Sequence, residues 1–368
     1  MNLAKIDKGI SDISANIDFF SLLAPLNLNE ESLKFFDAIK KGEQYNPLFR
    51  YKPVALSSEK EWLAERRKEL DAGNALQYIF LKKIRFILTQ IEFIESDDEH
   101  LKDVAVKLHG RPGPECINKA KEILKESKEE GYSFPEEPVT PGKMVKILQG
   151  YINEMGVDWS VALNDTIVPK VTVSGGKRLI SINSSTNYTT DEIDRLKIHE
   201  VEVHVYRGAN GHEQPYRIFA EGLAGYNETE EGLALVVEER TGCHQRDTRQ
   251  MKLYAGRALC VDLCLRGSFY DTFMEMRKYF PEYLAYRLAE RGKRGLEDTS
   301  LPGGFTKDAH YISGFEKVQK FLDDGGNVSL LYVGKVGLDD ADPVKDLLAL
   351  GELVPPRHIS QLFKGTHE

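Results

Sequence analysis

Two histidines that bracket a glutamate are the residues of this sequence with the clearest chemical meaning. His199, Glu200 and His204 lie in the segment His-Glu-Val-Glu-Val-His, and Glu231 follows in Thr-Glu-Glu-Gly-Leu-Ala at residues 229–234. A catalytic zinc ion takes three nitrogen or oxygen ligands from the protein and keeps a fourth position for water. A glutamate beside the first histidine can accept the proton of that water. These residue types therefore predict a zinc hydrolase.

The spacing of the two histidines is unusual for such a site. His199 and His204 are five residues apart, and residues at this spacing diverge by roughly 140° around a regular α-helix. They can converge on one ion only if the helix is locally under-wound, as in a π-bulge, and such bulges are concentrated at functional sites. Two interpretations remain open: a bulged metal-binding helix, or a solvated helix that happens to carry histidine and glutamate.

The flanking residues predict a helix for the histidines. Thr189 and Thr190 precede the acidic stretch 191–194, a pattern typical of an N-cap and first turn. The buried side of the helix would be formed by Ile193, Leu196, Val201 and Val203. A polar loop containing glycines is expected from Gly208 to Gly225.

A second helix is predicted to begin near Asn227, whose spacing to Glu230 is that of a capping box. Glu231 lies in its first turn, from which it could face the first helix. A favourable interaction with the helix dipole explains an acid at this place equally well, and it applies to Glu228 and Glu230 too.

The combination of motifs resembles the microtubule-associated tyrosine carboxypeptidase family and its bacterial relatives, which are named for a QEGLA motif. The resemblance spans most of residues 46–340 and rests on His-Glu-x-x-x-His, on Thr-Glu-Glu-Gly-Leu-Ala and on further matches at Asn46–Tyr51, Arg207-Gly208, Gln214-Pro215, Lys293–Gly295, Asp298–Asp308 and Tyr311. It implies one zinc ion held by His199, His204 and Glu231, with Glu200 as the general base. Glu230 stands where many bacterial members have glutamine, and this change leaves Glu231 in place.

Hydrolysis of a peptide bond needs further groups around the zinc ion. Tyr311, His310 and Lys307, in the matched loop, are candidates for a second donor to the oxyanion. A carboxypeptidase must also bind a terminal carboxylate, for which Lys293 and Arg294 are the first candidates. Alternatively, all of these are ordinary loop or surface residues.

Charge along the chain suggests what a substrate looks like. Residues 240–294 hold twelve Lys or Arg against six Asp or Glu, although the whole chain has a net charge of -9. A basic wall beside the zinc ion, densest at Arg287, Arg291, Lys293 and Arg294, would attract an acidic peptide or protein C-terminal tail. Arg207, in the matched Arg-Gly pair, is a further substrate-binding candidate. The alternative for such a run is a solvated helix face.

Other partner classes are disfavoured. The negative net charge and the absence of a binding fingerprint argue against nucleic acid. No apolar stretch approaches the eighteen residues of a membrane span, and the N-terminus lacks the apolar core of a signal peptide. Four cysteines in 368 residues make no disulfide framework, and Cys260 and Cys264 are expected to be core thiols on one helical face. We therefore expect a reducing, cytoplasmic compartment.

The fold class expected is α+β and helix-rich, with a small antiparallel sheet beside a bulged metal-binding helix. Residues 1–98 would form a helical N-terminal subdomain and residues 99–368 the zinc metallopeptidase-like catalytic domain, with a linker at 96–99. Helices are predicted at 10–23, 30–41, 59–93, 116–130 and 143–154, and the chain should again be mostly helical from the second metal helix to about 280. A hairpin is predicted from 167–173 and 178–182, a short strand at 330–336, and a loop at 301–305 that closes over the site.

The function predicted from the sequence is that of a zinc carboxypeptidase acting on a protein or peptide C-terminus. Two alternatives remain: a zinc enzyme that hydrolyses a different amide, and a regulatory binding protein that keeps the metal structurally. Glu200 argues against the last, because a structural zinc site does not need a base beside its ligand.

Overall fold

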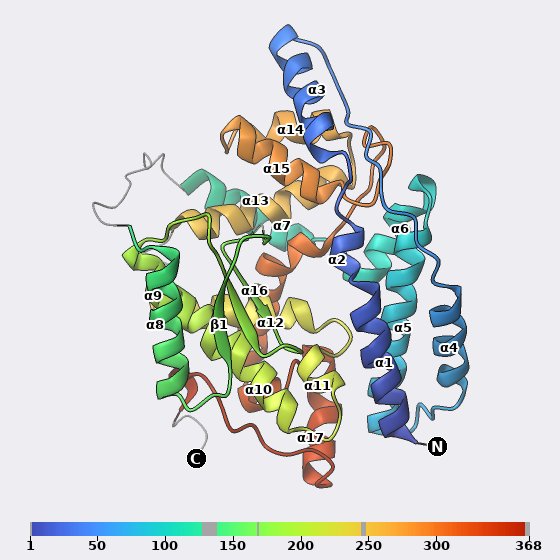
Figure 1. The fold of residues 1–368 in the computed structure, drawn as a ribbon, viewed down its shortest axis with the longest axis vertical. Coiled ribbons are helices and arrows are strands. Elements are labelled where there is room, and N and C mark those ends of the chain that lie inside the picture. The colour runs from blue at the N-terminus through green and yellow to red at the C-terminus, as the bar shows by residue number, and fades with distance from the viewer. Residues whose placement is uncertain (1, 127–137, 168, 244–247, 365–368) are drawn as a thin grey trace.

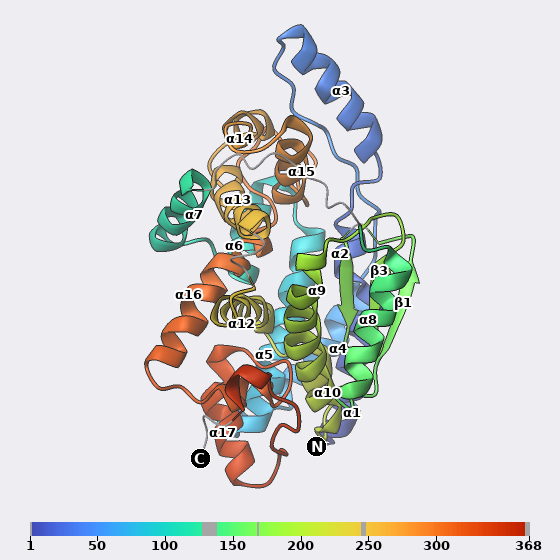
Figure 2. The same ribbon diagram turned by 90° about the vertical axis from the view of Figure 1, so that its left-hand side faces the viewer.

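A computed structural model of the chain describes residues 2–126, 138–167, 169–243 and 248–364. It confirms a helix-rich α+β fold in which one small sheet lies among many helices (Figure 1). Figure 2 shows the sheet at one side of the molecule, with α3 extending away from the remaining helices. Within the described residues, no helix is both long and apolar enough to cross a membrane.

The first hundred residues form six helices: α1 (Leu3–Ile17), α2 (Phe19–Leu22), α3 (Leu28–Lys41), α4 (Ser57–Lys68), α5 (Ala75–Glu95) and α6 (Asp98–His109). The single long helix expected at 59–93 is wrong, because the Asn74 side chain caps a new helix at Gln77 N. The expected linker at 96–99 is shortened to residues 96 and 97, since Asp97 is the N-cap of α6 and accepts from His100 N. Short polar side chains that looked like loop residues are therefore helix caps.

Helices α7 (Pro114–Glu126) and α8 (Pro141–Glu154) confirm the next two predictions closely. Most of the proline-rich connection expected at 134–141 lies outside the described residues. The hairpin is confirmed as β2 (Val171–Ser174) paired antiparallel with β3 (Leu179–Asn183).

The sheet has a third strand that we did not expect. Strand β1 (Ser160–Asn164) pairs with β3 in parallel, so the strand order is β1-β3-β2 and the sheet is mixed rather than antiparallel. The central position falls to β3 because it carries the most buried side chains, with Ile180 and Ile182 fully enclosed.

The metal-motif histidines lie in the middle of one helical stretch, formed by α9 (Thr190–Leu196), the π-helix η1 (Lys197–Val205) and α10 (Tyr206–Glu213). Thr189 and Glu192 make the capping box at its start, which confirms the predicted N-terminus. The loop expected from Gly208 is wrong, because α10 continues through it. Gly208 and Gly211 serve packing instead: a Cβ there would lie 2.7 Å from the Trp159 ring and 2.4 Å from the Phe219 carbonyl oxygen.

A short helix, α11 (Ile218–Glu221), leads to α12 (Tyr226–Arg240), which carries Glu231. The capping box expected from Asn227 is wrong: Gly225, with φ 72°, precedes the helix and no side chain caps it. The left-handed backbone at this turn favours glycine. The helix therefore begins one residue earlier than Asn227.

The remaining elements are mostly helical: α13 (Thr248–Cys264), α14 (Phe269–Met276), α15 (Glu282–Gly292), η2 (Lys307–Ala309), α16 (His310–Asp323), η3 (Val328–Tyr332), η4 (Leu338–Asp340), α17 (Ala341–Ala349) and η5 (Gln361–Phe363). The strand expected at 330–336 is wrong, because η3 is a 3-10 helix. Its carbonyls and those just after it turn inward, where Leu331 O and Gly334 O accept from Arg207 Nε at 2.8 and 3.3 Å. A buried guanidinium thus uses the carbonyls that a strand would need.

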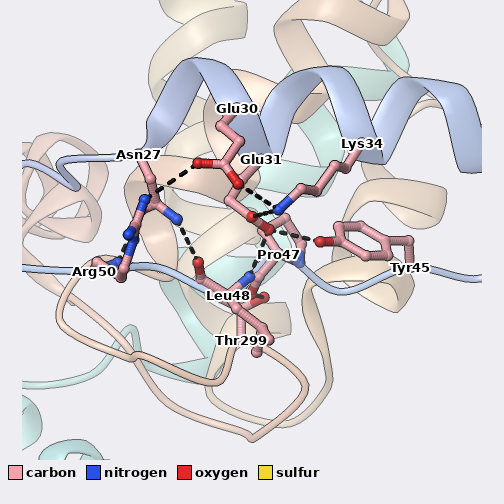
Figure 3. A network of polar contacts seen from close by, with 9 residues as sticks. All are labelled: Asn27, Glu30, Glu31, Lys34, Tyr45, Pro47, Leu48, Arg50 and Thr299. Atoms are coloured by element: carbon pink, nitrogen blue, oxygen red, sulfur yellow. Dashed lines mark hydrogen bonds and ion pairs between the residues drawn. The ribbon is translucent and has the colours of Figure 1, made fainter.

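The segment Asn46–Tyr51 is tied between α3 and the loop at 295–299 (Figure 3). Glu31 of α3 accepts from Leu48 N at 2.9 Å and from Tyr45 Oη at 2.7 Å. On the other side of the segment, Thr299 Oγ1 donates a hydrogen bond of 2.6 Å to Pro47 O. These contacts attach α3 to the part of the chain that follows α15.

Two hydrophobic cores hold the molecule together. One packs α7, α8, the sheet, η1, α12, α13 and α16, and it includes Phe35 and Phe49 from the N-terminal region. The other packs α1, α4, α5 and α6 against residues 218–223, 296–305 and 330–353. Because both cores cross residue 98, the limit expected between 1–98 and 99–368 is not a limit between hydrophobic cores. Cys260 and Cys264 are buried core thiols, as predicted.

Candidate metal centre

The π-helix η1 brings the two motif histidines together. His199 and His204 have ring centroids 4.8 Å apart at an interplanar angle of 65°. Hydrogen bonds in a π-helix span five residues rather than four, so residues at this spacing stack on one face. Side-chain atoms of His199, Glu200 and His204 that are able to bind a metal lie within 4.8 Å of one another. The predicted bulge between the histidines is therefore confirmed.

Helix α12 brings the carboxylate of Glu231 beside His199, although the group of donor atoms within 4.8 Å of one another consists of His199, Glu200 and His204. Glu231 Oε2 lies 3.7 Å from His199 Nε2, and both side chains are nearly buried. Two ligands on a tetrahedral zinc ion, each about 2.0–2.1 Å from it, would be about 3.4 Å apart. The observed separation is longer than a hydrogen bond and close to this value. Two imidazoles and a carboxylate are also a donor set that zinc accepts, so these residues fit the metal.

Two further carboxylates of α12 orient the imidazole rings, and sequence reasoning missed both. Glu238 Oε1 lies 2.6 Å from His199 Nδ1, and Glu230 Oε2 lies 3.3 Å from His204 Nδ1. Metal-binding histidines almost always donate the second ring N–H to such a partner. Each histidine thus keeps Nε2 for the site. The seven-residue spacing from Glu231 to Glu238, two helical turns, was the available signal.

These orienting carboxylates are themselves held by buried cations. Arg207 Nη1 lies 3.4 Å and Lys335 Nζ 3.2 Å from Glu230, while Arg195 Nη1 lies 3.8 Å from Glu238. Removing charges from water is costly unless they are paired. The outer cations therefore offset part of the cost of burying Glu230 and Glu238 on one helix face.

The pKa values of His199 and Glu231 show that the carboxylates of the site favour a positive charge between them. Burial lowers the pKa of His199, but the contacts with Glu231 and Glu238 outweigh burial and raise it to about 10. Burial raises the pKa of Glu231, yet the facing histidines outweigh it and lower the value to about 2. The negative charge that raises the pKa of His199 would equally attract a metal cation to this position.

Helices α12 and α16, which carry Glu231 and Tyr311, pack unusually closely. A Cβ on Gly232 would lie 2.1 Å from the carbonyl carbon of Gly314, and a Cβ on Gly314 would lie 2.0 Å from Glu228 O. Only glycine fits at this crossing. Tyr311, one turn before Gly314, stacks on Tyr254 of α13 with ring centroids 4.2 Å apart. Burial and the charge of Glu231 raise the pKa of the Tyr311 phenol.

The expected basic wall is an internal set of pairs. Lys293 is fully buried, and its ammonium donates to Cys264 O, Gly267 O and Leu301 O at 3.2, 2.5 and 2.5 Å. Arg294 binds Glu290 at 2.8 Å. Arg287 lies 3.3 Å from Glu290, and Arg291 makes two hydrogen bonds of 2.7 Å to Asp308.

Arg207 has likewise no donors turned to solvent. Its guanidinium is fully buried and donates to Leu331 O, Gly334 O and Val336 O in addition to the Glu230 ion pair. That Arg207, Lys293 and Arg294 bind substrate stays a prediction, but in the fold their charged groups already have partners within the chain. Their contacts make them part of the scaffold, where they neutralise carboxylates or satisfy carbonyls that folding buries.

The remaining candidates of the matched loop make different contacts. His310 uses its Nε2 in a contact of 3.0 Å with His109 O. Lys307 Nζ lies 5.0 Å from the Phe20 ring centroid, and its charge helps to lower the pKa of Glu231. The loop at 301–305 is tied down, because Gly303 N donates to Cys264 O and Phe305 N to Gly292 O at 2.8 and 2.9 Å.

Comparison with known proteins agrees with the motif. A model of the family described as microtubule-associated tyrosine carboxypeptidase matches residues 34–368. The chain belongs to this family. A human protein named microtubule-associated tyrosine carboxypeptidase 1 is 29% identical over 225 residues, which cover 59% of this chain and 45% of that protein. A mouse protein named putative tyrosine carboxypeptidase MATCAP2 is 25% identical over 359 residues, which cover 95% of this chain and 60% of that protein.

The microtubule-associated tyrosine carboxypeptidase match includes every residue of the candidate centre. It begins within α3, so that α1 and α2 precede it. The chain spans 45% and 60% of the length of the two relatives. Assignment to the bacterial QEGLA branch stays a prediction.

Proposed function

We propose that this protein is a zinc-dependent carboxypeptidase that removes a residue from the C-terminus of a protein or peptide. The observation that carries the proposal is the pairing of each histidine Nδ1 with a carboxylate of α12, while His199 Nε2 faces Glu231 at 3.7 Å. This arrangement supports His199, His204 and Glu231 as ligands of one zinc ion. The names of the relatives support a C-terminal tyrosine as the residue removed.

A zinc ion at this centre would act as a Lewis acid that polarises the scissile carbonyl and acidifies a water molecule. Glu200, whose carboxylate lies beside both histidines, accepts the proton of that water. The same carboxyl group then passes the proton to the leaving amine. These two transfers need one residue near both the water and the scissile nitrogen, which is the position of Glu200 between the two ligand histidines.

Tyr311 is suited to stabilise the tetrahedral oxyanion. Because its pKa is raised by burial and by Glu231, the phenol stays protonated and can donate a hydrogen bond. A donor fixed before the reaction stabilises the charge that develops in the transition state. The stack on Tyr254 holds the ring in one place. Lys307 adds positive charge near Glu231 and is retained as a substrate-binding candidate.

The proposal is tested with zinc-loaded protein and a library of peptides with diverse C-termini, with products identified by mass spectrometry. We expect loss of single C-terminal residues, reduced at least about 100-fold in Glu200→Gln, because general acid–base catalysis contributes that much or more. Glu200→Gln should still bind zinc. Internal cleavage would exclude an exopeptidase. Intact peptides with hydrolysis of another amide, or with no hydrolysis at all, would support the two alternatives, and undiminished zinc in His204→Ala would refute the ligand assignment.

A further inference from the structure

Among the described residues, Arg257 has an unused guanidinium close to the candidate metal centre. It lies on α13 one helical turn after Tyr254, so that both side chains share a face. Its guanidinium carbon lies 4.9 Å from the Tyr311 ring centroid and 5.6 Å from that of Tyr254. Tyr311 lies on α16 one turn before Gly314, which contacts Gly232, the residue after Glu231, at the crossing of α12 and α16. Arg257 therefore packs on a ring beside the crossing at which the candidate ligand lies.

The donors of Arg257 lack the partners that neighbouring cations have. Arg257 Nε is buried and makes no hydrogen bond, and no carboxylate among the described residues forms an ion pair with this guanidinium. Asp308 is the nearest acid to consider, but both of its oxygens are taken by Arg291 at 2.7 Å. A buried donor without a partner costs free energy unless a ligand or water supplies the acceptor.

The contact with the tyrosine rings leaves the N–H groups of Arg257 available for a ligand. A guanidinium that lies over a tyrosine ring uses its flat face, whereas its N–H groups point outward within its own plane. Those N–H groups form a fork that matches the two oxygens of a carboxylate.

We propose that Arg257 binds the terminal α-carboxylate of the substrate and thereby positions the last peptide bond at the metal centre. This inference rests on the proposed function and assigns to it the residue that selects chain ends. An internal peptide bond has no such carboxylate, so Arg257 would explain why the enzyme removes terminal residues. Arg257 replaces Lys293 and Arg294, whose charged groups are occupied within the fold.

The test is a binding measurement that does not depend on turnover. Zinc-loaded Glu200→Gln protein is titrated into an N-terminally fluorescent acidic hexapeptide that ends in tyrosine, with either a free carboxylate or a carboxamide at its C-terminus. Fluorescence anisotropy gives the two dissociation constants. We expect the free acid to bind about 10- to 100-fold more tightly than the amide, which is the range for hydrogen bonds to charged groups.

The variants identify the residue responsible. Glu200→Gln/Arg257→Gln should bind acid and amide within about twofold of each other, because the charged hydrogen bonds are gone. Glu200→Gln/Arg257→Lys should keep part of the preference, since lysine retains the charge without the fork. The matched control is Glu200→Gln/Arg249→Gln, which removes the same charge from an exposed position on α13 and should preserve the full preference. Thermal unfolding and zinc content check that each variant is folded.

The result separates the inference from the proposed function. A preference for the acid that persists without Arg257, equal binding of both peptides, or binding of neither would overturn the role of Arg257. Failure of the proposed function shows instead in the wild-type protein, as a free-acid peptide that stays intact during prolonged incubation. A preference that depends on Arg257 in a protein that cleaves nothing would leave a binding site for chain ends and refute the hydrolase.

Discussion

The side chains around the candidate centre come from two helical elements, with His199, Glu200 and His204 on η1 and three carboxylates on α12. Helix α12 contributes Glu231 to the proposed ligand set and uses Glu230 and Glu238 to hold the second nitrogen of each histidine. Fixing a ligand before the metal arrives lowers the entropy lost on binding. If the centre binds zinc as proposed, the outer carboxylates would therefore influence its affinity without being ligands.

Replacing Glu238 by glutamine tests this role at the residue scale. The amide can still contact His199 Nδ1, but it is a weaker acceptor, so we expect zinc affinity to fall about 10- to 100-fold. Competition with a zinc-binding dye gives the affinity. The control is Glu239→Gln, one residue further and turned about 100° around the helix. Equal zinc affinity in Glu238→Gln and wild type would contradict the assignment.

At the scale of elements, the crossing of α12 and α16 decides where Tyr311 lies. Gly232 and Gly314 let the two backbones approach so closely that a methyl group at either position would collide with main-chain atoms. Backbone contacts of this kind cannot be relieved by a change of rotamer. The glycine of the Thr-Glu-Glu-Gly-Leu-Ala motif thus acts through packing, one residue after the proposed ligand.

We expect Gly232→Ala to lower the free energy of unfolding by about 1–3 kcal/mol, the usual cost of overpacking, and to reduce activity by shifting Glu231 relative to Tyr311. Chemical denaturation and peptide turnover measure the two effects. Gly150→Ala is the matched control: it is also helical, its Cβ would meet nothing within 4 Å, and it should raise stability by about 0.5–1 kcal/mol. A Gly232→Ala variant as stable as the wild type would refute the close crossing.

The Glu31 network of Figure 3 is a second element-scale device, because it attaches α3 to the segment Asn46–Tyr51. The side chain of Glu31 is 3% exposed. Burial raises its pKa, but the hydrogen bonds from Lys34, Leu48 N and Tyr45 outweigh burial and lower it. A lowered pKa stabilises the fold above the pKa of the unfolded chain, about 4.3, and this contribution disappears as pH falls through the folded value.

Glu31→Gln should therefore destabilise the protein by about 1–3 kcal/mol at neutral pH, since charged hydrogen bonds are lost inside the fold. The difference from wild type should shrink below about pH 4, where Glu31 itself becomes protonated. Thermal unfolding across pH provides the measurement. Glu30→Gln, whose carboxylate is 53% exposed, should change stability by less than about 1 kcal/mol. A pH-independent difference would show that the charge of Glu31 is not responsible.

At the scale of the whole molecule, the N-terminal helices are built into the catalytic part. Asp7 of α1 accepts from Arg217 N and Ile218 N at 2.8 and 3.1 Å, at the start of the short helix that connects the two metal helices. Lys83 of α5 donates to Gly222 O at 2.6 Å. The core formed by these helices continues to α17. The first hundred residues therefore support the turn between α10 and α12.

A chain that lacks residues 1–98 should not fold independently. Loss of residues 1–98 would expose the apolar side of residues 218–223 and 330–353. Exposed patches of this kind cause aggregation. Expression of residues 99–368, followed by size-exclusion chromatography and calorimetry, tests this expectation. A soluble monomer with a cooperative unfolding transition would show instead that the catalytic part is an independent domain.

Local sequence determined much about this protein. The side chains of His199, Glu200, His204 and Glu231 predicted the zinc chemistry proposed here, and the five-residue spacing predicted the under-wound helix that the structure shows. The hairpin and most helices followed from periodicity and turn residues, because these depend on neighbours along the chain. The predicted helix and loop boundaries were wrong where a short polar residue caps a new helix, as at Asn74. They were also wrong where a glycine allows close packing inside a helix, as at Gly208.

Only the tertiary structure decided which charged groups are free. Arg207 and Lys293 have the same side-chain chemistry as a substrate-binding cation, yet burial gives all their donors to carbonyls and carboxylates. Arg257 carried no motif and was not singled out, although its guanidinium lies beside Tyr311 without a hydrogen-bond partner at Nε. A partner can lie anywhere along the chain, so pairing cannot be read from local spacing. Residue types and spacing were enough to propose the zinc ligands, whereas the packing of α13 against α16 was needed to find Arg257 beside Tyr311.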